Sequence, residues 1–435
     1  MIKYILQMIA LFTGMALALP AGAAVHEISP GKPLQAAVEA ATPGDVLRLS
    51  AGRHQGPVVI DRPLALIGEA GAVVEGPGKG SVITLTAPEV RIEGLTIRGS
   101  GIDLPAMDSG ILATRDAPRA VVRGNRFEGN LFGVYLHGAA GALVEANVII
   151  GRGDLRMSEA GNGVSIWNAP GARILNNGIR QGRDGIFVTT SRDVTFQDNH
   201  FSGLRFAIHY MYTHDSRVIG NISKDNHVGW AIMFSDRLEI RDNVSLGDRD
   251  HGLMLNAANE SAITGNVVRD GGDLLRGRGS AGREKCVFIY NANKNRIADN
   301  RFEGCPIGIQ FTAGSERNQV TGNAFIANRT QVKYVGTRRV EWSAEGRGNY
   351  YSDHPAFDLD GDGVADTAYR PNDVMDNVLW SLPQAKLLLN SPAVEAIRWA
   401  QARFPAIYPG GVVDSAPLMR PPGDQTEQPG REERP

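Results

Sequence analysis

Strong charge and long apolar stretches are both missing from this sequence of 435 residues. The formal net charge is only -2, which argues against a general electrostatic grip on nucleic acid, since nucleic-acid-binding domains are usually basic. Beyond residue 24 no run of about eighteen apolar residues occurs. We therefore expect a mature chain that does not span a membrane and does not bind nucleic acid.

Helical periodicity is missing between the apolar runs of the repeats, and the common catalytic motifs are missing from the sequence. No segment between the apolar runs carries apolar residues at i, i+3 and i+4, and the leucine signature of leucine-rich repeats is not found. The sequence contains no phosphate-binding loop, no dinucleotide fingerprint and no Ser-His-Asp order. These absences disfavour helical repeats and the commonest nucleotide-dependent and serine-hydrolase chemistries.

A repeated phrase is present instead, in which Gly-Asn or Asp-Asn precedes an apolar alternation. Its asparagines are separated by 22, 30, 22, 22, 22, 23, 34 and 23 residues. A repeat of this length predicts a solenoid. We expect the asparagines to form a ladder inside one bend, because their amides satisfy the polar groups of neighbouring turns. They are Asn125, Asn147, Asn177, Asn199, Asn221, Asn243, Asn266, Asn300 and Asn323.

The apolar alternation has the period of two that a strand needs to bury one face. Ile186 with Val188, and Ile208 with Tyr210, are examples. Because no covering helix is available, we predict an all-β chain folded as a right-handed parallel β-helix with turns of about 22 residues.

The N-terminus reads as a secretory signal over residues 1–23. Lys3 is followed by an apolar run from Ile5 to Leu19, and Ala21-Gly22-Ala23 forms an A-x-A cleavage site. We therefore expect export of a soluble protein.

The remaining chain divides into four regions by composition. Residues 24–348 form the β-helix, with an N-terminal capping helix at Leu34–Ala41, and polar insertions at 101–109, 152–162 and 270–284 precede the same strand of a turn. Residues 349–377 are rich in Asp, residues 378–419 are apolar and partly helical, and residues 420–435 form a disordered tail. Insertions at one corner gather on one side of a solenoid, and that side is often the binding face.

The apolar region near the C-terminus has two interpretations. Trp380, Leu387, Leu388 and Trp399 are a large apolar load for a chain end. They either cap the second open end of the solenoid or dock a partner.

The two cysteines, Cys286 and Cys305, lie 19 residues apart. An oxidising compartment permits a disulfide, but the offset of three residues from a full turn opposes the required Cα separation. A disulfide and a buried or copper-binding thiol both stay open.

Aligning the repeats on asparagine shows which side chains point outward from the repeated strand. The outward columns bring Met211 and Met233 one turn apart, His209 two residues from Met211, and Met254 beyond Ala231. Thioether and imidazole ligands without a carboxylate suit Cu(I), and His214 lies just past the strand. Methionines also fill apolar gaps, so the alternative is ordinary packing.

An acidic loop follows the solenoid. Asp358, Asp360, Asp362 and Asp366, with Gly363 at the turn, have the spacing of a calcium loop, although Tyr369 replaces the expected glutamate. We interpret it as a structural Ca²⁺ site, with an ordinary Asp/Gly turn as the alternative.

Many parallel β-helices process acidic polysaccharides with clustered aspartates, or with an aspartate beside a histidine and basic residues. The outward columns show no such pair, and Asp184, Asp250 and His251 are predicted on bends. We therefore expect no catalytic residues, and a polysaccharide-binding or uronate-processing β-helix is the alternative function.

Four longer phrases carry a resemblance to a known family. They are FAIHYMYTHDSRVIGN (206–221), GWAIMFS (229–235), KCVFIYNANKNRI (285–297) and GNYYSDHPAFDLDGDGVADTAYRPNDV (348–374). Together with the exported Asn repeats, they resemble the NosD family of periplasmic nitrous oxide reductase maturation proteins, over the mature chain up to about Leu418.

The resemblance implies a non-enzymatic periplasmic factor. It would work with a membrane ABC-type permease and its cytoplasmic ATPase, receive copper from a copper-chaperone lipoprotein, and help assemble the copper-sulfide centre of nitrous oxide reductase. It makes the C-terminal apolar region a candidate for permease docking. It supplies no ligands, so His209, Met211, His214, Met233 and Met254 come from the strand geometry alone. Whether the transported species is copper or a sulfur compound stays open.

Overall fold

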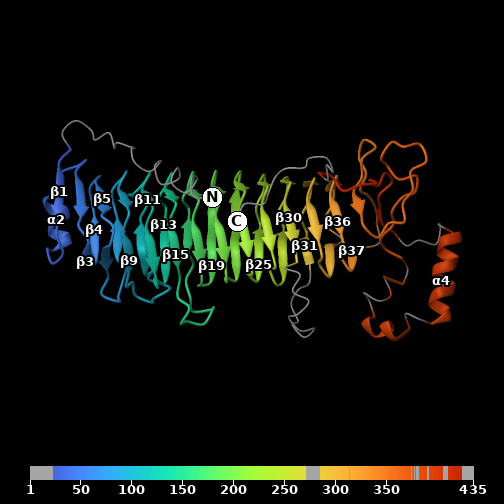
Figure 1. The fold of residues 1–435 in the computed structure, drawn as a ribbon, viewed down its shortest axis with the longest axis horizontal. Coiled ribbons are helices and arrows are strands. Elements are labelled where there is room, and N and C mark those ends of the chain that lie inside the picture. Colours follow the sequence, from blue (N-terminus) through green and yellow to red (C-terminus); the bar gives the residue numbers. More distant parts are fainter. Residues whose placement is uncertain are drawn as a thin grey trace, which may run out of the picture.

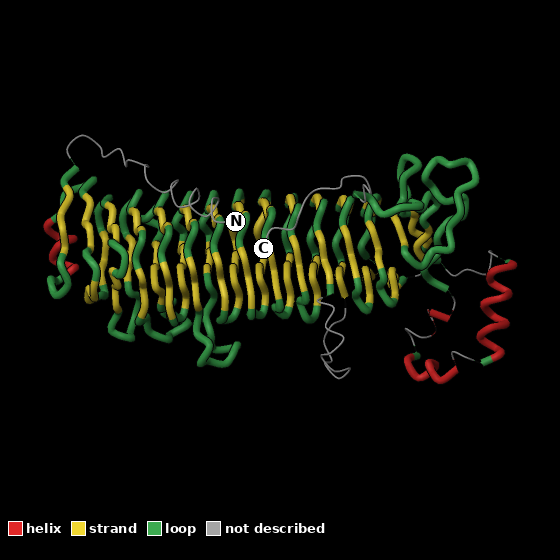
Figure 2. The backbone as a smooth tube through the Cα atoms, viewed as in Figure 1, coloured by secondary structure: helices red, strands yellow, loops and turns green. Residues whose placement is uncertain are grey.

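A computed structural model describes residues 23–270, 285–312, 314–336, 338–373, 375–376, 378, 382–388, 391–404 and 410–423. The chain winds into a rod of stacked turns with strands running across its length (Figures 1 and 2). Every strand pair within the three long sheets is parallel. The predicted parallel β-helix is therefore confirmed.

Three parallel sheets run along the rod. Sheet A contains β1 (Val25–Ile28), β2 (Val46–Leu49), β5 (Ala65–Gly68), β8 (Arg91–Glu93), β11 (Val121–Arg123), β14 (Leu143–Glu145), β17 (Arg173–Leu175), β20 (Thr195–Gln197), β23 (Arg217–Ile219), β26 (Glu239–Arg241), β29 (Ala262–Thr264), β32 (Arg296–Ala298) and β35 (Gln319–Thr321). Sheet B contains β3 (Gly52–Gln55), β6 (Ala72–Glu75), β9 (Thr96–Arg98), β12 (Arg126–Glu128), β15 (Val148–Ile150), β18 (Gly178–Arg180), β21 (His200–Ser202), β24 (Ile222–Lys224), β27 (Val244–Leu246), β30 (Val267–Arg269), β33 (Arg301–Glu303), β36 (Ala324–Ile326) and β39 (Tyr350–Tyr351).

Sheet C has the longer strands. It contains β4 (Val58–Ile60), β7 (Ile83–Leu85), β10 (Ser109–Ala113), β13 (Phe132–His137), β16 (Val164–Trp167), β19 (Asp184–Arg192), β22 (Phe206–His214), β25 (Val228–Met233), β28 (His251–Asn256), β31 (Lys285–Tyr290), β34 (Ile307–Thr312) and β37 (Thr330–Val335). The predicted insertions precede β10, β16 and β31, so all three adjoin this sheet, although residues 271–284 lie outside the described residues.

The asparagine ladder is confirmed, and it extends further than predicted. From Asn147 onward, each side-chain oxygen accepts a hydrogen bond from the backbone N–H of the asparagine one turn earlier, as Asn147 does from Asn125 at 2.9 Å and Asn221 does from Asn199 at 3.1 Å. Asn349 adds a further rung. These bonds give the buried backbone N–H groups of the bend an acceptor, which buried N–H groups require.

Two different structures close the ends of the core. The helix α2 (Leu34–Ala40) covers the N-terminal end with Leu34 and Val38, as predicted, and both side chains are buried. At the other end β38 (Arg339–Glu341) pairs with β40 (Gly411–Val413). Buried Trp342 and Val412 belong to the same apolar core as the rest of the solenoid.

Asp414 terminates the asparagine ladder at the C-terminal end. Its Oδ2 atom accepts hydrogen bonds from the N–H and side-chain amide of Asn349 at 2.7 and 2.9 Å, and from the Tyr351 hydroxyl at 3.0 Å. The last rung has no further turn to donate to, so a carboxylate, which only accepts, fits it. The cap therefore includes residues 339–369 and 411–418.

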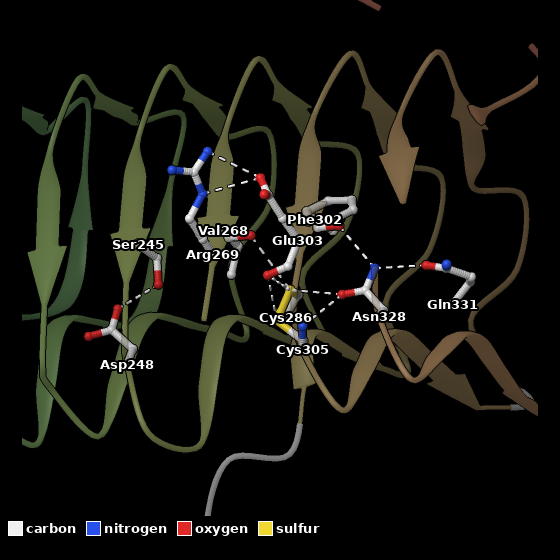
Figure 3. Close-up of a disulfide and its surroundings, with 10 residues drawn as sticks. All are labelled: Ser245, Asp248, Val268, Arg269, Cys286, Phe302, Glu303, Cys305, Asn328 and Gln331. Carbon is white, nitrogen blue, oxygen red and sulfur yellow. Dashed lines mark hydrogen bonds and ion pairs between the residues drawn. A yellow bond between two sulfur atoms is a disulfide. The ribbon is translucent and has the colours of Figure 1, made fainter. Parts of the chain in front are cut away.

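The disulfide left open by the sequence is present. Cys286 and Cys305 are bonded with their Cα atoms 5.7 Å apart, which is within the usual range. Cys286 lies at the start of β31 and Cys305 lies in the bend one turn later, where the N–H of Cys305 donates to Asn328 (Figure 3). In this state neither sulfur is a free thiol for copper.

Candidate functional site on the outer face of sheet C

The strands of sheet C place two columns of side chains on the outside of the rod. In β22, Ile208 and Tyr210 are fully buried in the core, so the alternating residues between them point outward. Strand pairing confirms the predicted register from β13 to β31. We call these two columns the outer strip: Tyr135, Ser165, Phe187, His209, Ala231, Met254 and Phe288 in the first, and His137, Trp167, Thr189, Met211, Met233, Asn256 and Tyr290 in the second.

Four of the predicted soft ligands, His209, Met211, Met233 and Met254, lie on three neighbouring strands of the outer strip. Met211 and Met233 are directly paired across β22 and β25, at the strand spacing of about 4.8 Å. Ala231 pairs with His209 on one side and with Met254 on the other. Although Ala231 is on the outer face, its exposed fraction is 0%. The larger side chains around it therefore cover its methyl group.

His209 is held by a carboxylate. Its Nδ1 atom lies 3.2 Å from Oδ2 of Asp184, and its side chain is 11% exposed. The ring centroids of Phe187 and Phe206 lie 5.0 and 4.9 Å from the imidazole. The imidazole is thus fixed on three sides by its neighbours in the outer layer.

Asp184 corrects the sequence-based prediction. We expected this residue on a bend, but it begins β19, pairs with Phe206 in register and is 2% exposed. Its two oxygens also accept hydrogen bonds from Nε and Nη2 of Arg205 at 2.8 and 2.6 Å. Burial alone would raise the pKa of Asp184, but the hydrogen bonds from His209 and Arg205 outweigh it and hold the pKa below its ordinary value.

The prediction for His251 was wrong in the same way, because His251 begins β28 and does not lie on a bend. The register places both residues at the starts of strands of sheet C, where Asp184 pairs with Phe206 and His251 with Val228. Asp184 lies one 22-residue turn before Phe206, which makes it the diagonal neighbour of His209. The residue that pairs with His209 is Phe187, so alignment of the central columns does not bring Asp184 beside the imidazole.

His214 is separate from this group. It is the last residue of β22, beyond a bend where Tyr212 has a φ of 48°. Its Nδ1 atom accepts a hydrogen bond from the backbone N–H of Asp236 at 3.1 Å. The structure therefore gives this nitrogen a local partner and places His214 on the flank of the outer strip.

An exposed aromatic pair borders the two methionines. Tyr212 and Phe234 follow Met211 and Met233 directly, are 50% and 40% exposed, and stack with their ring centroids 5.1 Å apart. Flat apolar surface of this kind is common where proteins contact partners.

The comparisons with known proteins agree on one family. A family model described as "Periplasmic copper-binding protein (NosD)" matches residues 145–356. A protein of Stutzerimonas stutzeri named "Probable ABC transporter binding protein NosD" is 40% identical over 384 residues, covering 87% of each chain. A protein of the same name from Pseudomonas aeruginosa PAO1 is 45% identical over 379 residues, covering 86% of this chain and 88% of that one.

This chain belongs to the NosD family.

Solved structures share the fold of this NosD family member at low sequence identity. The A-module of the mannuronan C-5 epimerase AlgE6 from Azotobacter vinelandii has a TM-score of 0.53 and 14% identity, covering 69% of this chain and 90% of that one. The Dettilon tailspike protein has a TM-score of 0.54 and 17% identity, covering 67% and 62%. These similarities show the β-helix fold alone.

The C-terminal apolar region of this NosD family member stands beyond the end of the solenoid. It includes the 3-10 helix η1 (Pro383–Leu388) and the helix α4 (Pro392–Arg403) (Figure 1). Leu387 is 92% exposed, Leu388 58% and Trp399 61%, while Trp380 lies outside the described residues. No helix in the part of the chain that the structure describes is long and apolar enough to cross a membrane.

The acidic loop brings three of its four aspartates together. Single oxygens of Asp358, Asp360 and Asp362 lie within 4.8 Å of one another, whereas Asp366 accepts a hydrogen bond from the N–H of Leu359 at 2.9 Å. Hydrogen bonds from the N–H groups of Gly363 and Gly361 hold the pKa of Asp358 below its ordinary value. The calcium site stays a prediction.

Proposed function

We propose that this protein is a periplasmic accessory factor for nitrous oxide reductase maturation, which binds Cu(I) on the outer strip and passes it on together with an ABC-type permease and its ATPase. Membership of a family described as periplasmic and copper-binding supports the proposal. The observation that supports it most is the register of sheet C, in which Met211 pairs with Met233 and Ala231 lies between His209 and Met254.

The donor set suits Cu(I) as cargo. Thioether sulfur and imidazole nitrogen are soft to intermediate ligands that favour Cu(I) over hard cations. The one nearby carboxylate, Asp184, is paired with Arg205 and is too buried to attract a hard cation from solvent. On an outer face an incoming partner can exchange ligands one at a time, which permits transfer without unfolding.

Two exposed apolar surfaces are the proposed contacts with partner proteins. Tyr212 and Phe234 offer an apolar contact beside the methionine pair for a donor such as a copper-chaperone lipoprotein, or for nitrous oxide reductase as acceptor. The relatives are named as ABC transporter binding proteins, and the exposed side chains of Leu387, Leu388 and Trp399 are the proposed contact with the permease.

The test is a Cu(I) competition titration of the double variant Met211→Ala/Met233→Ala. We expect an affinity loss of roughly ten-fold or more, because two thioether ligands are removed while the inward side of the strands is untouched. Met419→Ala is the control, since this thioether lies in the C-terminal cap and outside the outer strip. Unchanged affinity in the first variant, with the circular dichroism spectrum preserved, would contradict the proposed site.

One observation favours a second function. Asp184, His209 and Arg205 form the combination of acid, imidazole and guanidinium that polysaccharide-processing β-helices use. However, the Asp184 side chain is 2% exposed and Arg205 engages both of its oxygens, so a sugar ring has no access to it. We expect calorimetric titration with uronate oligosaccharides to show no more heat than a neutral glucose oligomer; saturable heat would favour this alternative.

A further inference from the structure

The contact between Asp184 and His209 has the geometry by which proteins orient a metal-binding histidine. A histidine that ligates metal commonly donates its other ring N–H to a carboxylate, which fixes the tautomer and the plane of the ring. Here Oδ2 of Asp184 lies 3.2 Å from Nδ1 of His209. A carboxylate without a proton can only accept, so Nδ1 must carry the hydrogen, and in the neutral ring Nε2 then presents its lone pair.

We infer that Asp184, itself locked by Arg205, is a positioning residue that sets His209 as an Nε2 ligand for soft metal on the outer strip. The inference rests on the proposed copper function. Arg205 donates to both oxygens of Asp184, at 2.8 and 2.6 Å, so the carboxylate cannot rotate away from the ring. The rings of Phe187 and Phe206 also contact the imidazole, at centroid distances of 5.0 and 4.9 Å.

An Asp–Arg ion pair between neighbouring turns forms elsewhere in the rod without a histidine. Asp215 and Arg237 make the same end-on pair between neighbouring turns, with Nε and Nη2 distances of 2.6 and 2.9 Å, and both of those side chains are about half exposed. Asp184 and Arg205 differ because they lie under the outer layer and add a third contact, to His209. The substitution Asp215→Asn is therefore a matched control, because it removes one carboxylate charge from an ion pair of the same geometry.

The first readout is the tautomer of His209 in the metal-free protein. Two-bond ¹H–¹⁵N spectra of histidine-labelled protein, with His209→Ala to assign the signal, distinguish a protonated from an unprotonated ring nitrogen. We expect the wild type to be protonated at Nδ1. In Asp184→Asn the amide oxygen is needed by Arg205, so the amide NH₂ turns toward the ring and shifts the population toward the Nε2-protonated form. Asp215→Asn leaves the spectrum of His209 unchanged.

The second readout is Cu(I) affinity by chelator competition, with Ag(I) as a redox-inert probe. We expect Asp184→Asn to lower affinity by roughly 10- to 100-fold, the usual effect of losing such a partner, and Asp215→Asn to have no effect. If His209→Ala weakens binding but Asp184→Asn does not, or if wild-type His209 is protonated at Nε2, the positioning role is wrong. If His209→Ala leaves affinity unchanged, the proposed copper site itself fails, whatever the tautomer.

Discussion

Two buried carboxyl groups of the solenoid behave in opposite ways because their donors differ. Burial would raise the pKa of Asp184, but its contacts with His209 and the guanidinium of Arg205 hold it below the ordinary value. Asp248 accepts hydrogen bonds only from neutral donors: the hydroxyls of Ser223 and Ser245, each at 2.6 Å, and the N–H of Asn226 at 2.9 Å. Burial therefore dominates and raises the pKa of Asp248 to about 6.

The raised pKa of Asp248 predicts that the free energy of unfolding depends on pH. In the unfolded chain this carboxyl titrates near pH 4, so between pH 4 and 6 the folded state binds more protons, and stability falls as pH rises through this window. We expect Asp248→Asn to raise the free energy of unfolding at pH 8 by roughly 1–3 kcal/mol, with little change at pH 4. The amide still accepts from Asn226 and donates to the serines.

Urea unfolding of the wild type and of Asp248→Asn at both pH values measures this difference. The exposed Asp193→Asn is the control for removing one negative charge. A gain for Asp248→Asn that is equal at pH 4 and pH 8 would show that the charge of Asp248 is not the cause.

At the scale of one element, the asparagine ladder links each turn to the next through side chains. Asn221 accepts from the backbone N–H of Asn199 at 3.1 Å, and its own amide donates to the carbonyl of Phe196 at 2.9 Å and to Asn243 at 2.9 Å. All of these groups are buried. Every turn therefore depends on its neighbours for hydrogen bonding as well as for apolar packing.

We expect Asn221→Ala to lower the free energy of unfolding by about 2–5 kcal/mol, since several buried donors and acceptors lose their partner at once. Chemical denaturation measures this loss. Asn256→Ala, on the outer face of sheet C, removes the same amide without touching the ladder and should cost well under 1 kcal/mol. Equal losses in the two variants would mean that the ladder adds nothing beyond packing.

At the scale of the molecule, the C-terminal chain leaves the solenoid and returns to it. It is anchored where Asn372 donates to the carbonyl of Val332 at 2.9 Å, and again where β40 pairs with β38. The apolar region lies between these anchors and carries exposed Leu387 and Trp399. A contact made there is thus tied to the last turns of the rod.

This arrangement predicts that substitutions in the apolar region weaken permease binding without changing the stability of the solenoid. Leu387→Asp/Trp399→Asp should leave the thermal unfolding of the solenoid unchanged, because these side chains are outside the core. The same variant should reduce co-purification with the permease by several-fold, because charge opposes burial of the apolar contact. Ile102→Asp, which changes a side chain that is 60% exposed in an insertion, is the control. A large drop in melting temperature would instead favour the capping interpretation.

Much of the candidate site was predictable because it repeats. The pairing of Met211 with Met233, and the position of Ala231 between His209 and Met254, follow from a 22-residue period and strand alternation. The partner of His209 was missed because Asp184 lies 25 residues away, three more than a turn, so it becomes visible only when a diagonal contact between neighbouring strands is considered.

The sequence by itself determined the β-helix, the asparagine ladder and the outward columns, because contacts between adjacent turns recur at one period and each turn repeats the same local choice. Only the tertiary structure decided the contact between Asp184 and His209, the disulfide between Cys286 and Cys305, the hydrogen bonds by which Asp414 ends the ladder and the position of α4. These depend on chain segments that leave the period, and their partners are set by how bends and caps meet in space rather than by spacing along the chain.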